Sequence, residues 1–425
     1  MSTSCAVPGG GLIGMFLPPP GPLRAYALMS FFDSLARGVM LAGGVLYFTR
    51  VVGLGAVQVG AGLSVATLVG LSASLPTGVL GDRIGHRRLL VGLHAARAAL
   101  LAAYLLVDSF PVFLLVVGLA GLAESAVEPV RQGCLGTLTT PGNRVETLAY
   151  NRVVHNVGIS LGTPALGAAL VAGTAFAFRL LIAFGALGIL IACAAAARLP
   201  DRRPEKSPGG SLMTVLRDRP YLGLALLNGL LSLHSELLEI AVPLWVAEYT
   251  GAPAWTAPLL LLVNVFLAIG FQMRAGRGVT EVGSAARALR RAGLAVLGCA
   301  LAFATTGSLP SPLAVAVLVV AVTLLTAAEL FQSAGSWSLS YELAAPERLG
   351  EYQGAWNVGT QLGRAGGPFA ITLALSGLGA AGWVVLGLTY AAAATLALPL
   401  ARRAAATRPR AAEVRERAAE RLAGV

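Results

Sequence analysis

Long apolar stretches, almost free of charged residues, recur along the whole of this 425-residue sequence. Only 12% of the residues are charged, whereas a soluble domain has about 25%. Each stretch is close to the ~20 residues that a helix needs to cross a bilayer, and too long for a strand of a membrane barrel. We therefore predict an all-α membrane protein with twelve transmembrane helices. The predicted spans are 25–49, 56–80, 89–107, 112–137, 148–171, 179–197, 220–246, 254–273, 290–307, 312–339, 353–375 and 379–401.

Basic residues are concentrated in alternate loops. The loops after the even-numbered spans contain Arg83, Arg87, Arg88, Arg144, Arg198, Arg202, Arg203, Lys206, Arg217, Arg219, Arg274, Arg277 and Arg287. The opposite loops contain little beyond Arg50 and Arg179. Because positive loops stay inside, we expect a multi-pass protein of the inner (plasma) membrane with both termini in the cytoplasm. These loops also account for the net charge of +11, so the expected partners are membrane lipids and not nucleic acid.

The sequence divides into two halves of six predicted helices. A polar stretch rich in proline and glycine follows the sixth span, as expected of a linker. Segments 141–167 and 346–368 resemble each other, since both begin with a proline and run into a glycine-rich helix. Such repeats are common in transporters. We predict a cytoplasmic N-terminal segment (1–23), a first half (24–197), a cytoplasmic linker (198–219), a second half (220–401) and a basic cytoplasmic tail (402–425), in a monomer.

Carboxylates within the apolar stretches occur only on the first, fourth, seventh and tenth spans. They are Asp33, Glu124, Glu128, Glu236, Glu239 and Glu329. An ionised group is costly in hydrocarbon, so such residues normally face a bundle interior or a water-filled cavity. Their spacing by three spans predicts that the same element of each repeat lines one polar pathway, as in a transporter.

The loop between the second and third spans reads Gly78-Val79-Leu80-Gly81-Asp82-Arg83-Ile84-Gly85-His86-Arg87-Arg88. It resembles the signature loop of the major facilitator superfamily, G-x-L-x-D-R-x-G-R-[KR]-[KR], and departs from it only at His86. The resemblance implies twelve helices in two halves and alternating access. It also places Asp82 near the start of the eleventh span, around 350–353, where a helix N-terminus attracts negative charge. We expect a conformational latch formed by Gly78, Asp82, Arg83, Gly85, Arg87 and Arg88; the alternative is that the arginines only hold the loop inside.

Two other motifs match the family incompletely. The fifth span contains Gly158-x-x-x-Gly162-Thr163-Pro164, which resembles the glycine–proline motif of the family's antiporters, but Thr163 separates the glycine from the proline. The family's fourth-span motif begins with an arginine, whereas 116–119 is apolar here. The resemblance to the family's antiporters is therefore only partial.

Acids in the predicted pathway have two alternative roles, proton carriage and static ion pairing. The proton-coupling candidates are Asp33, Glu124, Glu236 and Glu239. Glu236 and Glu239 rank first, because no arginine lies near them in sequence. The ion-pair candidates are Arg37, Glu128, Arg131, Arg152, Glu329 and Arg364, with Glu128–Arg152 and Glu329–Arg364 as the expected pairs. We expect His94 and Arg97 to be structural or interfacial.

Polar and aromatic residues on the predicted cavity spans are candidates for substrate binding. They are Phe32, Asn228, His234, Trp245, Gln332, Trp337, Asn357 and Gln361. For each aromatic residue, core packing or an interfacial belt is the competing explanation. His234, Glu236 and Glu239 do not share one helical face, so we expect neither a metal site nor a cofactor.

The motifs that drive ATP use or hydrolysis are not found: the sequence has no GxxxxGK[ST], GxSxG or HExxH. We therefore expect no enzyme. The leading hypothesis is a secondary active transporter that exports small amphipathic or cationic molecules in exchange for protons. One alternative is a proton-coupled symporter that imports a nutrient or metabolite. The other is a non-transporting membrane sensor or a membrane-embedded enzyme.

Overall fold

The computed structural model describes residues 21–40, 43–201, 213–253 and 255–406. Most of the predicted N-terminal segment (1–23), linker (198–219) and tail (402–425) therefore lies outside the described residues. The described chain is helical, with no strand among these residues. It forms two compact units, which we call unit 1 (1–214 and 345–358) and unit 2 (215–344 and 359–425).

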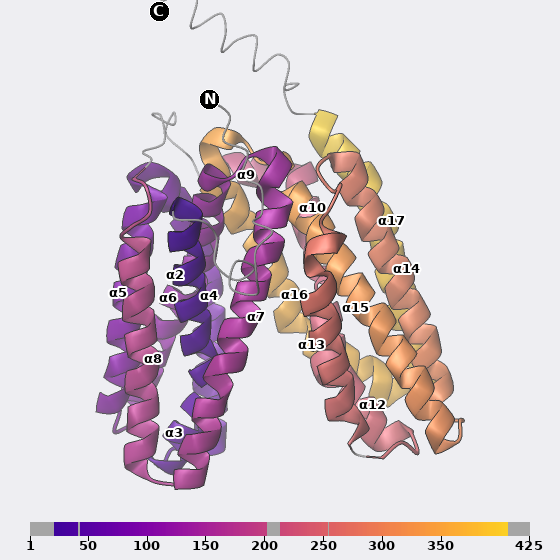
Figure 1. Cartoon of the computed structure of the whole chain (residues 1–425), viewed down its shortest axis with the longest axis horizontal. Helices are drawn as coiled ribbons and strands as arrows, with labels where there is room; N and C mark the ends of the chain where they lie inside the picture. The colour runs from indigo at the N-terminus through magenta and orange to yellow at the C-terminus, as the bar shows by residue number, and fades with distance from the viewer. Residues whose placement is uncertain (1–20, 41–42, 202–212, 254, 407–425) are drawn as a thin grey trace, which may run out of the picture. The chain divides into compact units, whose positions relative to one another are not determined.

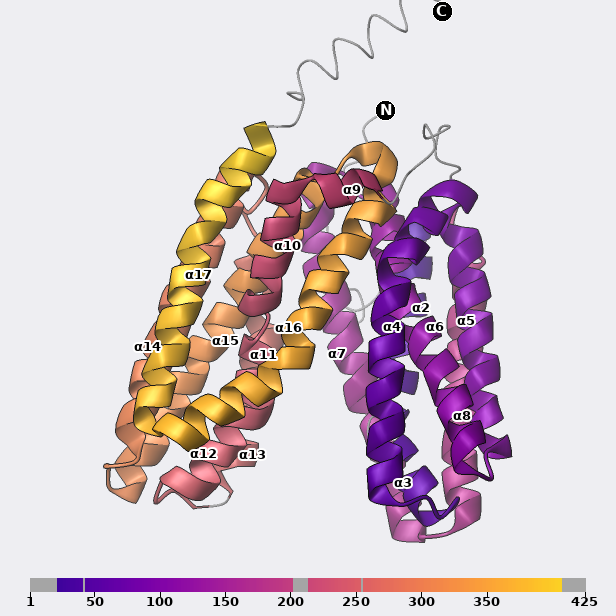
Figure 2. The same cartoon turned by 180° about the vertical axis from the view of Figure 1, so that it is seen from behind.

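Unit 1 is a bundle of antiparallel helices (Figures 1 and 2). Its α2 packs against α7 and α8, while α4 and α5 pack against α6. The helices are α2 (Pro22–Met40), α3 (Gly43–Arg50), α4 (Ala56–Ile84), α5 (His86–Ala103), α6 (Phe110–Leu138), α7 (Pro141–Ala172), α8 (Ala175–Ala196) and the first ten residues of α16 (Leu349–Leu378). The core at one end is aromatic, where Phe48 meets Tyr104 and Phe113 edge to face.

Unit 2 packs α14 against α15 and α17, and α10 against α17 (Figure 1). Its helices are α10 (Arg219–Leu231), α11 (His234–Glu236), α12 (Val242–Tyr249), α13 (Thr256–Ala275), α14 (Val282–Thr306), α15 (Ser311–Glu342), the rest of α16 and α17 (Ala380–Ala406); the short α9 (Met213–Arg217) precedes them.

The predicted seventh span is not one regular helix. After α10, the Ser232 N–H bonds to the carbonyls of both Asn228 and Gly229, and a turn follows. A π-helical segment, Leu237–Ala241, then joins α11 to α12. π-Helical turns inside longer helices are frequent at functional sites, and this one lies between Glu236 and Val242, with Glu239 inside it.

Ten stretches in the described part of the chain are long and apolar enough to cross a membrane. The interrupted α10–α12 stretch, Arg219–Tyr249, is one of them. The predicted first span corresponds to α2 and α3, which the undescribed 41–42 separates, and the eleventh falls in α16; neither is among the ten. Multiple membrane-spanning helices are therefore present, and the count of twelve stays a prediction.

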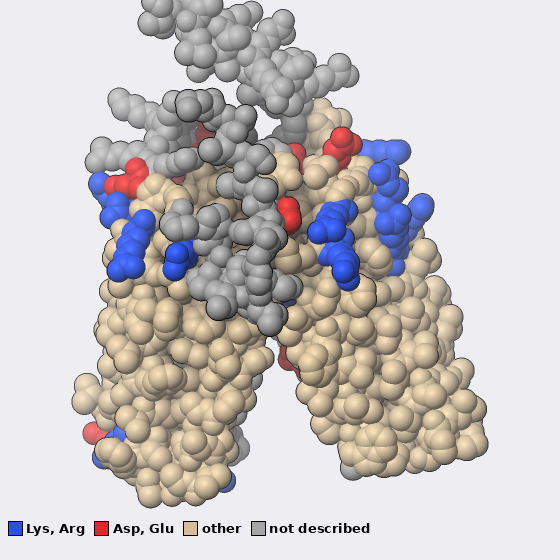
Figure 3. Space-filling model, in the orientation of Figure 1, with Lys and Arg blue, Asp and Glu red and all other residues tan. Residues whose placement is uncertain are grey.

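Basic side chains gather toward one end of each unit (Figure 3). In unit 1 this end contains the α4–α5 connection, and in unit 2 the α13–α14 connection. The surface between the two ends of each unit is almost uncharged (Figure 3). This distribution suits helices that cross a bilayer, with arginines at the headgroup level of one leaflet.

Glycines allow α10 and α16 to touch backbone to backbone in unit 2. A Cβ built on Gly229 would fall on the carbonyl oxygen of Gly359, and one built on Gly363 would fall on the carbonyl oxygen of Gly229. Small residues at four-residue spacing permit this close approach, which in a membrane replaces hydrophobic burial as a source of helix association.

We predict that Gly363→Ala lowers stability, because the added methyl group has no space against Gly229. Overpacking of this kind costs about 1–3 kcal/mol. The matched control is Gly366→Ala on the same helix, since a Cβ there meets nothing within 4 Å. We expect the control to be neutral or slightly stabilising, because alanine favours helix over glycine. Thermal unfolding of the purified protein in detergent compares them; equal effects of both substitutions would contradict the packing argument.

Candidate functional site

A partly buried network of charges joins three helices of unit 1. Arg97 on α5 donates from Nη1 to Oδ1 of Asp33 on α2. Its other terminal nitrogen, Nη2, lies 2.5 Å from Oε2 of Glu124 on α6. Arg37, one turn after Asp33, forms a second ion pair with Glu124, and its Nη2 lies 4.0 Å from Asp33 Oδ2. Two carboxylates and two guanidinium groups therefore balance each other inside the bundle.

His94 completes the network as a neutral acceptor. Its Nδ1 lies 3.3 Å from Arg97 Nη1 and 3.9 Å from Asp33 Oδ1. A guanidinium group has no lone pair to offer, so His94 Nδ1 must accept from Arg97, which leaves the proton on Nε2. His94 Nε2 is buried without a hydrogen-bond partner.

The two ends of this network differ in accessibility. The side chains of Asp33 and Arg97 are 2% and 7% exposed, whereas those of Arg37 and Glu124 are 39% and 38% exposed. Removing water strengthens the attraction within an ion pair. The Asp33–Arg97 pair is therefore shielded from solvent, and the Arg37–Glu124 pair is the accessible end of the network.

The accessible end opens into a cavity of about 310 Å³ that lies wholly within unit 1. Arg37, Arg97 and Glu124 form its polar end. The rest of its wall is mainly apolar and includes Met40, Phe48, Leu63, Leu101, Tyr104 and Val117. An apolar cavity with a few convergent polar groups is typical of a small-molecule site.

Glu128 forms a second cluster on the next turn of α6. Its carboxylate pairs with Arg131 at 2.5 Å and accepts a hydrogen bond from Gln132 Nε2 at 2.7 Å. The expected partner Arg152 lies half-buried on α7. Nearby on the same helix, His155 contacts the Ser34 hydroxyl.

Three of the substrate candidates lie in polar contacts across helices. In unit 2, Asn228 donates from Nδ2 to Thr360 Oγ1 at 3.0 Å and accepts at Oδ1 from Gln332 Nε2 at 2.9 Å. In unit 1, Asn357 donates to Ser74 Oγ at 2.8 Å.

The other substrate candidates are more dispersed. Trp245 is 2% exposed, stacks on Tyr249 and donates to Thr306 Oγ1 at 2.8 Å, which is a core-packing role. Phe32 packs edge to face on Phe31. Phe32, Trp337 and Gln361 are half-buried.

The acids of unit 2 occupy different environments. Glu329 is 8% exposed and accepts a hydrogen bond from Asn264 Nδ2 at 3.1 Å. Glu236 is half-buried and lies beside Gly367 of α16: a Cβ added to Gly367 would be 3.3 Å from the Glu236 Cγ. Glu239 is exposed. Arg364, the expected partner of Glu329, is exposed and lies on α16, one turn before Gly367.

The His234 ring bonds to the backbone at the end of α10. Its Nδ1 lies 3.0 Å from the carbonyl oxygen of Leu231, which can only accept, so His234 donates there. Within the part of the chain that the structure describes, no group of three His, Cys, Asp or Glu residues is placed to hold a metal ion.

Asp82 holds the amino end of α16 within unit 1. Its two carboxylate oxygens accept hydrogen bonds from the backbone N–H groups of Gly350 and Glu351, both at 2.8 Å. A Cβ built on Gly78 would fall on the carbonyl oxygen of Gly350, so only glycine permits this approach. The carboxylate therefore accepts from two N–H groups in the first turn of the helix, where a negative charge is favoured. We call this the Asp82 contact.

The residues around the Asp82 contact complete the loop. His86 is 6% exposed, and its Nε2 lies 3.3 Å from Asp82 Oδ1. Gly85 has φ of +97°, a conformation that favours glycine and lets α4 turn into α5. Arg88 pairs with Asp201 at 3.2 Å. Arg83 is exposed and Arg87 half-buried.

His94 and Arg97 were expected to be structural or interfacial, but their contacts with Asp33 and Glu124 were not foreseen, and Asn264 was not singled out. All three are buried and face an acid or its partner. The signal was present, because an arginine inside an apolar span is as costly as a carboxylate and needs a partner for the same reason.

Comparisons with known proteins agree with this architecture. Residues 26–368 match the family described as the Major Facilitator Superfamily. The uncharacterized MFS-type transporter Rv0849 of Mycobacterium tuberculosis (strain ATCC 25618 / H37Rv) is 25% identical over 305 residues, which cover 70% of this chain and 71% of that protein.

Solved structures share the fold. The MFS transporter FucP in its outward conformation superposes with a TM-score of 0.70 at 14% identity, covering 90% of this chain and 98% of that one. The human organic anion transporter MFSD10 (TETRAN) gives a TM-score of 0.61 at 20% identity, covering 90% of this chain and 100% of that one.

We predict that Arg97→Gln destabilises the protein strongly, because Asp33 then keeps a buried charge without its main partner. Removing one member of a buried ion pair costs about 3–5 kcal/mol. The double variant Asp33→Asn/Arg97→Gln is expected to regain much of this loss. Thermal unfolding in detergent measures both, with Arg50→Gln, an exposed arginine at the end of α3, as the control. A double variant no more stable than Arg97→Gln alone argues against the pairing.

Proposed function

Because this chain belongs to the major facilitator superfamily and is a secondary transporter rather than an enzyme, we propose that it exports small amphipathic or cationic molecules in exchange for protons. Transport proceeds by alternating access, in the inner membrane of a bacterial cell and with both termini in the cytoplasm. The gathering of basic side chains at one end of each unit supports this orientation.

The observation that carries the proposal is the charge network beside the apolar cavity of unit 1. Glu124 is the acid at its accessible end, paired with Arg37 and Arg97. When Glu124 takes up a proton, it loses its attraction to both arginines, and Asp33 remains as their only carboxylate in the network. When Glu124 is ionised, a cationic group that enters the cavity competes with Arg37 for it. Proton and cation thus use the same carboxylate at different times, which is the requirement for exchange.

Asp33 has a different role in this proposal. Its side chain is nearly fully buried against Arg97, so it stays ionised and holds the arginine in position. The apolar wall, with Met40, Phe48 and Tyr104, accommodates the hydrophobic part of an amphipathic molecule. In unit 2, Glu236 and Glu239 remain candidates for a second protonation site, supported by their place at a π-helical segment.

The Asp82 contact is proposed to act as the latch. It joins the last turn of α4 to the amino end of α16, and charge–dipole attraction of this kind is lost when the acid is neutralised. The latch biases the conformational equilibrium and does not touch the cavity. Arg83, Arg87 and Arg88 hold the loop at the membrane surface.

We predict that Glu124→Gln uncouples transport from the pH gradient. In proteoliposomes with ethidium as a cationic probe, gradient-driven flux falls by about tenfold or more, while gradient-free exchange stays within about threefold. Asp33→Asn lowers both, because it disturbs the position of Arg97. Glu248→Gln, at an exposed site on α12, is the control.

The direction of flux distinguishes export from import. Ethidium movement against the proton flow supports exchange, and movement with it supports a symporter. If Glu124→Gln remains fully gradient-driven, Glu124 is not the coupling site, and the same measurement on Glu236→Gln and Glu239→Gln tests the alternative carboxylates.

We also predict that Asp82→Asn slows transport by about three- to tenfold, since a charge–dipole interaction is worth up to ~1–2 kcal/mol when partly buried. Equilibrium binding of ethidium should change little, because Asp82 does not line the cavity. Asp108→Asn, at an exposed position between α5 and α6, is the matched control. Transport at the wild-type rate rules out the latch, and so does a loss of ethidium binding that accounts for the slower transport.

A further inference from the structure

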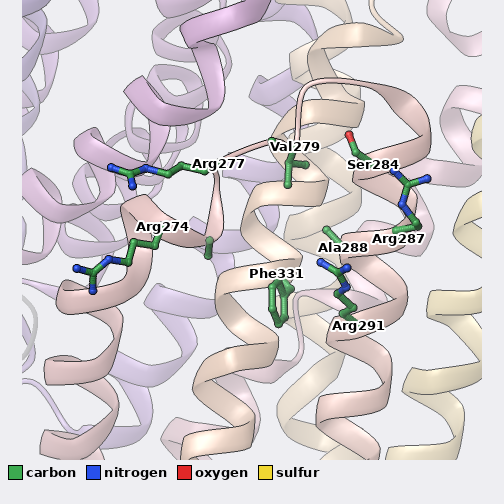
Figure 4. Close-up of a pocket in the computed structure, with 10 residues that line it drawn as sticks. Arg274, Arg277, Val279, Ser284, Arg287, Ala288, Arg291 and Phe331 are labelled. Atoms are coloured by element: carbon green, nitrogen blue, oxygen red, sulfur yellow. The ribbon is translucent and has the colours of Figure 1, made fainter. Parts of the chain in front are cut away.

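A pocket of about 300 Å³ lies at the basic end of unit 2, where α13 ends and α14 begins. Four arginines line it: Arg274 and Arg277 from the end of α13 and the loop after it, and Arg287 and Arg291 from α14. The buried Val279 and the half-buried Phe331 of α15 form its apolar part. We call it the arginine pocket (Figure 4).

The positive charge of the arginine pocket is poorly compensated. Between 274 and 291 the chain has five arginines and a single acid, Glu281. None of the five forms an ion pair with a carboxylate among the described residues. All four pocket arginines are exposed. Exposed cations clustered without a counter-charge favour an anionic ligand.

The side chains form two groups (Figure 4). Arg287 and Arg291 lie on one side with Ser284, and the Arg291 guanidinium stands 5.9 Å from the centre of the Phe331 ring. Arg274 and Arg277 extend together on the other side of the loop (Figure 4). Planar guanidinium groups match the oxygens of a phosphate, to which they can donate two hydrogen bonds at once.

Exposed apolar side chains occur along α13, the helix that ends at the pocket. Arg274 lies over the ring of Phe271, 5.7 Å from its centre. Phe271 is 48% exposed, and beyond it Phe266 and Leu262 are 72% and 54% exposed. A ligand with a charged head and a long apolar body fits this arrangement, whereas a free phosphate ion uses only the arginines.

We propose that the arginine pocket binds the phosphate group of an anionic phospholipid, with the acyl chains along the exposed apolar face of α13. Basic pockets at the ends of transmembrane helices are suited to anionic headgroups. The pocket volume accommodates a headgroup. The acyl chains would cover the exposed apolar residues of α13 and exclude water from them. This site is independent of the charge network in unit 1.

Binding of dioleoylphosphatidylglycerol to the purified full-length protein in detergent tests the proposal, with dioleoylphosphatidylcholine and inorganic phosphate as the other probes. Native mass spectrometry and the lipid-dependent rise in unfolding temperature both report binding. The decisive variant is Arg287→Gln/Arg291→Gln. The matched control is Arg290→Gln, which removes an exposed arginine of the same helix that does not line the pocket.

We expect the wild type to prefer phosphatidylglycerol over phosphatidylcholine by about tenfold, and the double variant to lose about 20-fold in affinity for phosphatidylglycerol. Arg290→Gln should stay within about threefold of the wild type, and the lysine pair Arg287→Lys/Arg291→Lys should retain part of the preference.

Three outcomes overturn the proposal. Equal binding of the two lipids shows that no anionic headgroup is selected. A loss in Arg290→Gln as large as in the double variant shows non-specific attraction to the whole basic end. Displacement of phosphatidylglycerol by millimolar inorganic phosphate assigns the pocket to a free anion instead of a lipid.

Discussion

The cost of an unpaired charge in a low-dielectric interior governs the arrangement of unit 1. Asp33 and Arg97 can each be buried as ions only because the other offsets the cost of desolvation. Their contact joins α2 to α5. Glu124 then adds α6 to the same guanidinium group, so one arginine sets the mutual position of three helices. The cavity lies beside this junction, and its polar end consists of the groups that the junction leaves partly exposed.

A second constraint acts where backbones touch. In lipid, helices gain little from hydrophobic burial against each other, so close packing must supply the association. Gly78 against Gly350 in unit 1, and Gly229 against Gly363 in unit 2, provide that approach. Both contacts involve α16, whose first ten residues belong to unit 1 and whose remainder belongs to unit 2. The Asp82 contact therefore acts on the one described helix that contributes a long segment to each unit, which makes it a suitable place for control of a conformational equilibrium.

The arginines of this chain serve three different physical purposes. Arg97 neutralises Asp33 and Glu124 in unit 1, Arg88 pairs with Asp201, and the arginines of the pocket in unit 2 remain without a carboxylate among the described residues. Net charge alone does not separate these uses. Burial separates only Arg97 from the others, because a buried guanidinium needs a fixed partner. Among the exposed arginines a carboxylate neighbour makes the difference: Arg88 has Asp201 beside it, whereas the pocket arginines are available to lipid phosphate.

The sequence by itself determined the class of fold, the signature loop and the identity of the costly acids. Hydrophobic length and the placement of arginines are local properties, so they can be read along the chain. The expectation that Asp82 lies near 350–353 came from the family pattern, and the hydrogen bonds to Gly350 and Glu351 lie there. Glu128 pairs with Arg131, three residues along its own helix, and helical spacing is enough to suggest that pair. The partner of Asp33 was settled by the tertiary structure alone, because Arg97 is 64 residues away. Adjacency in sequence cannot reveal such a pair, since the energy of a buried charge depends on which neighbouring helix brings a counter-charge within a few ångströms.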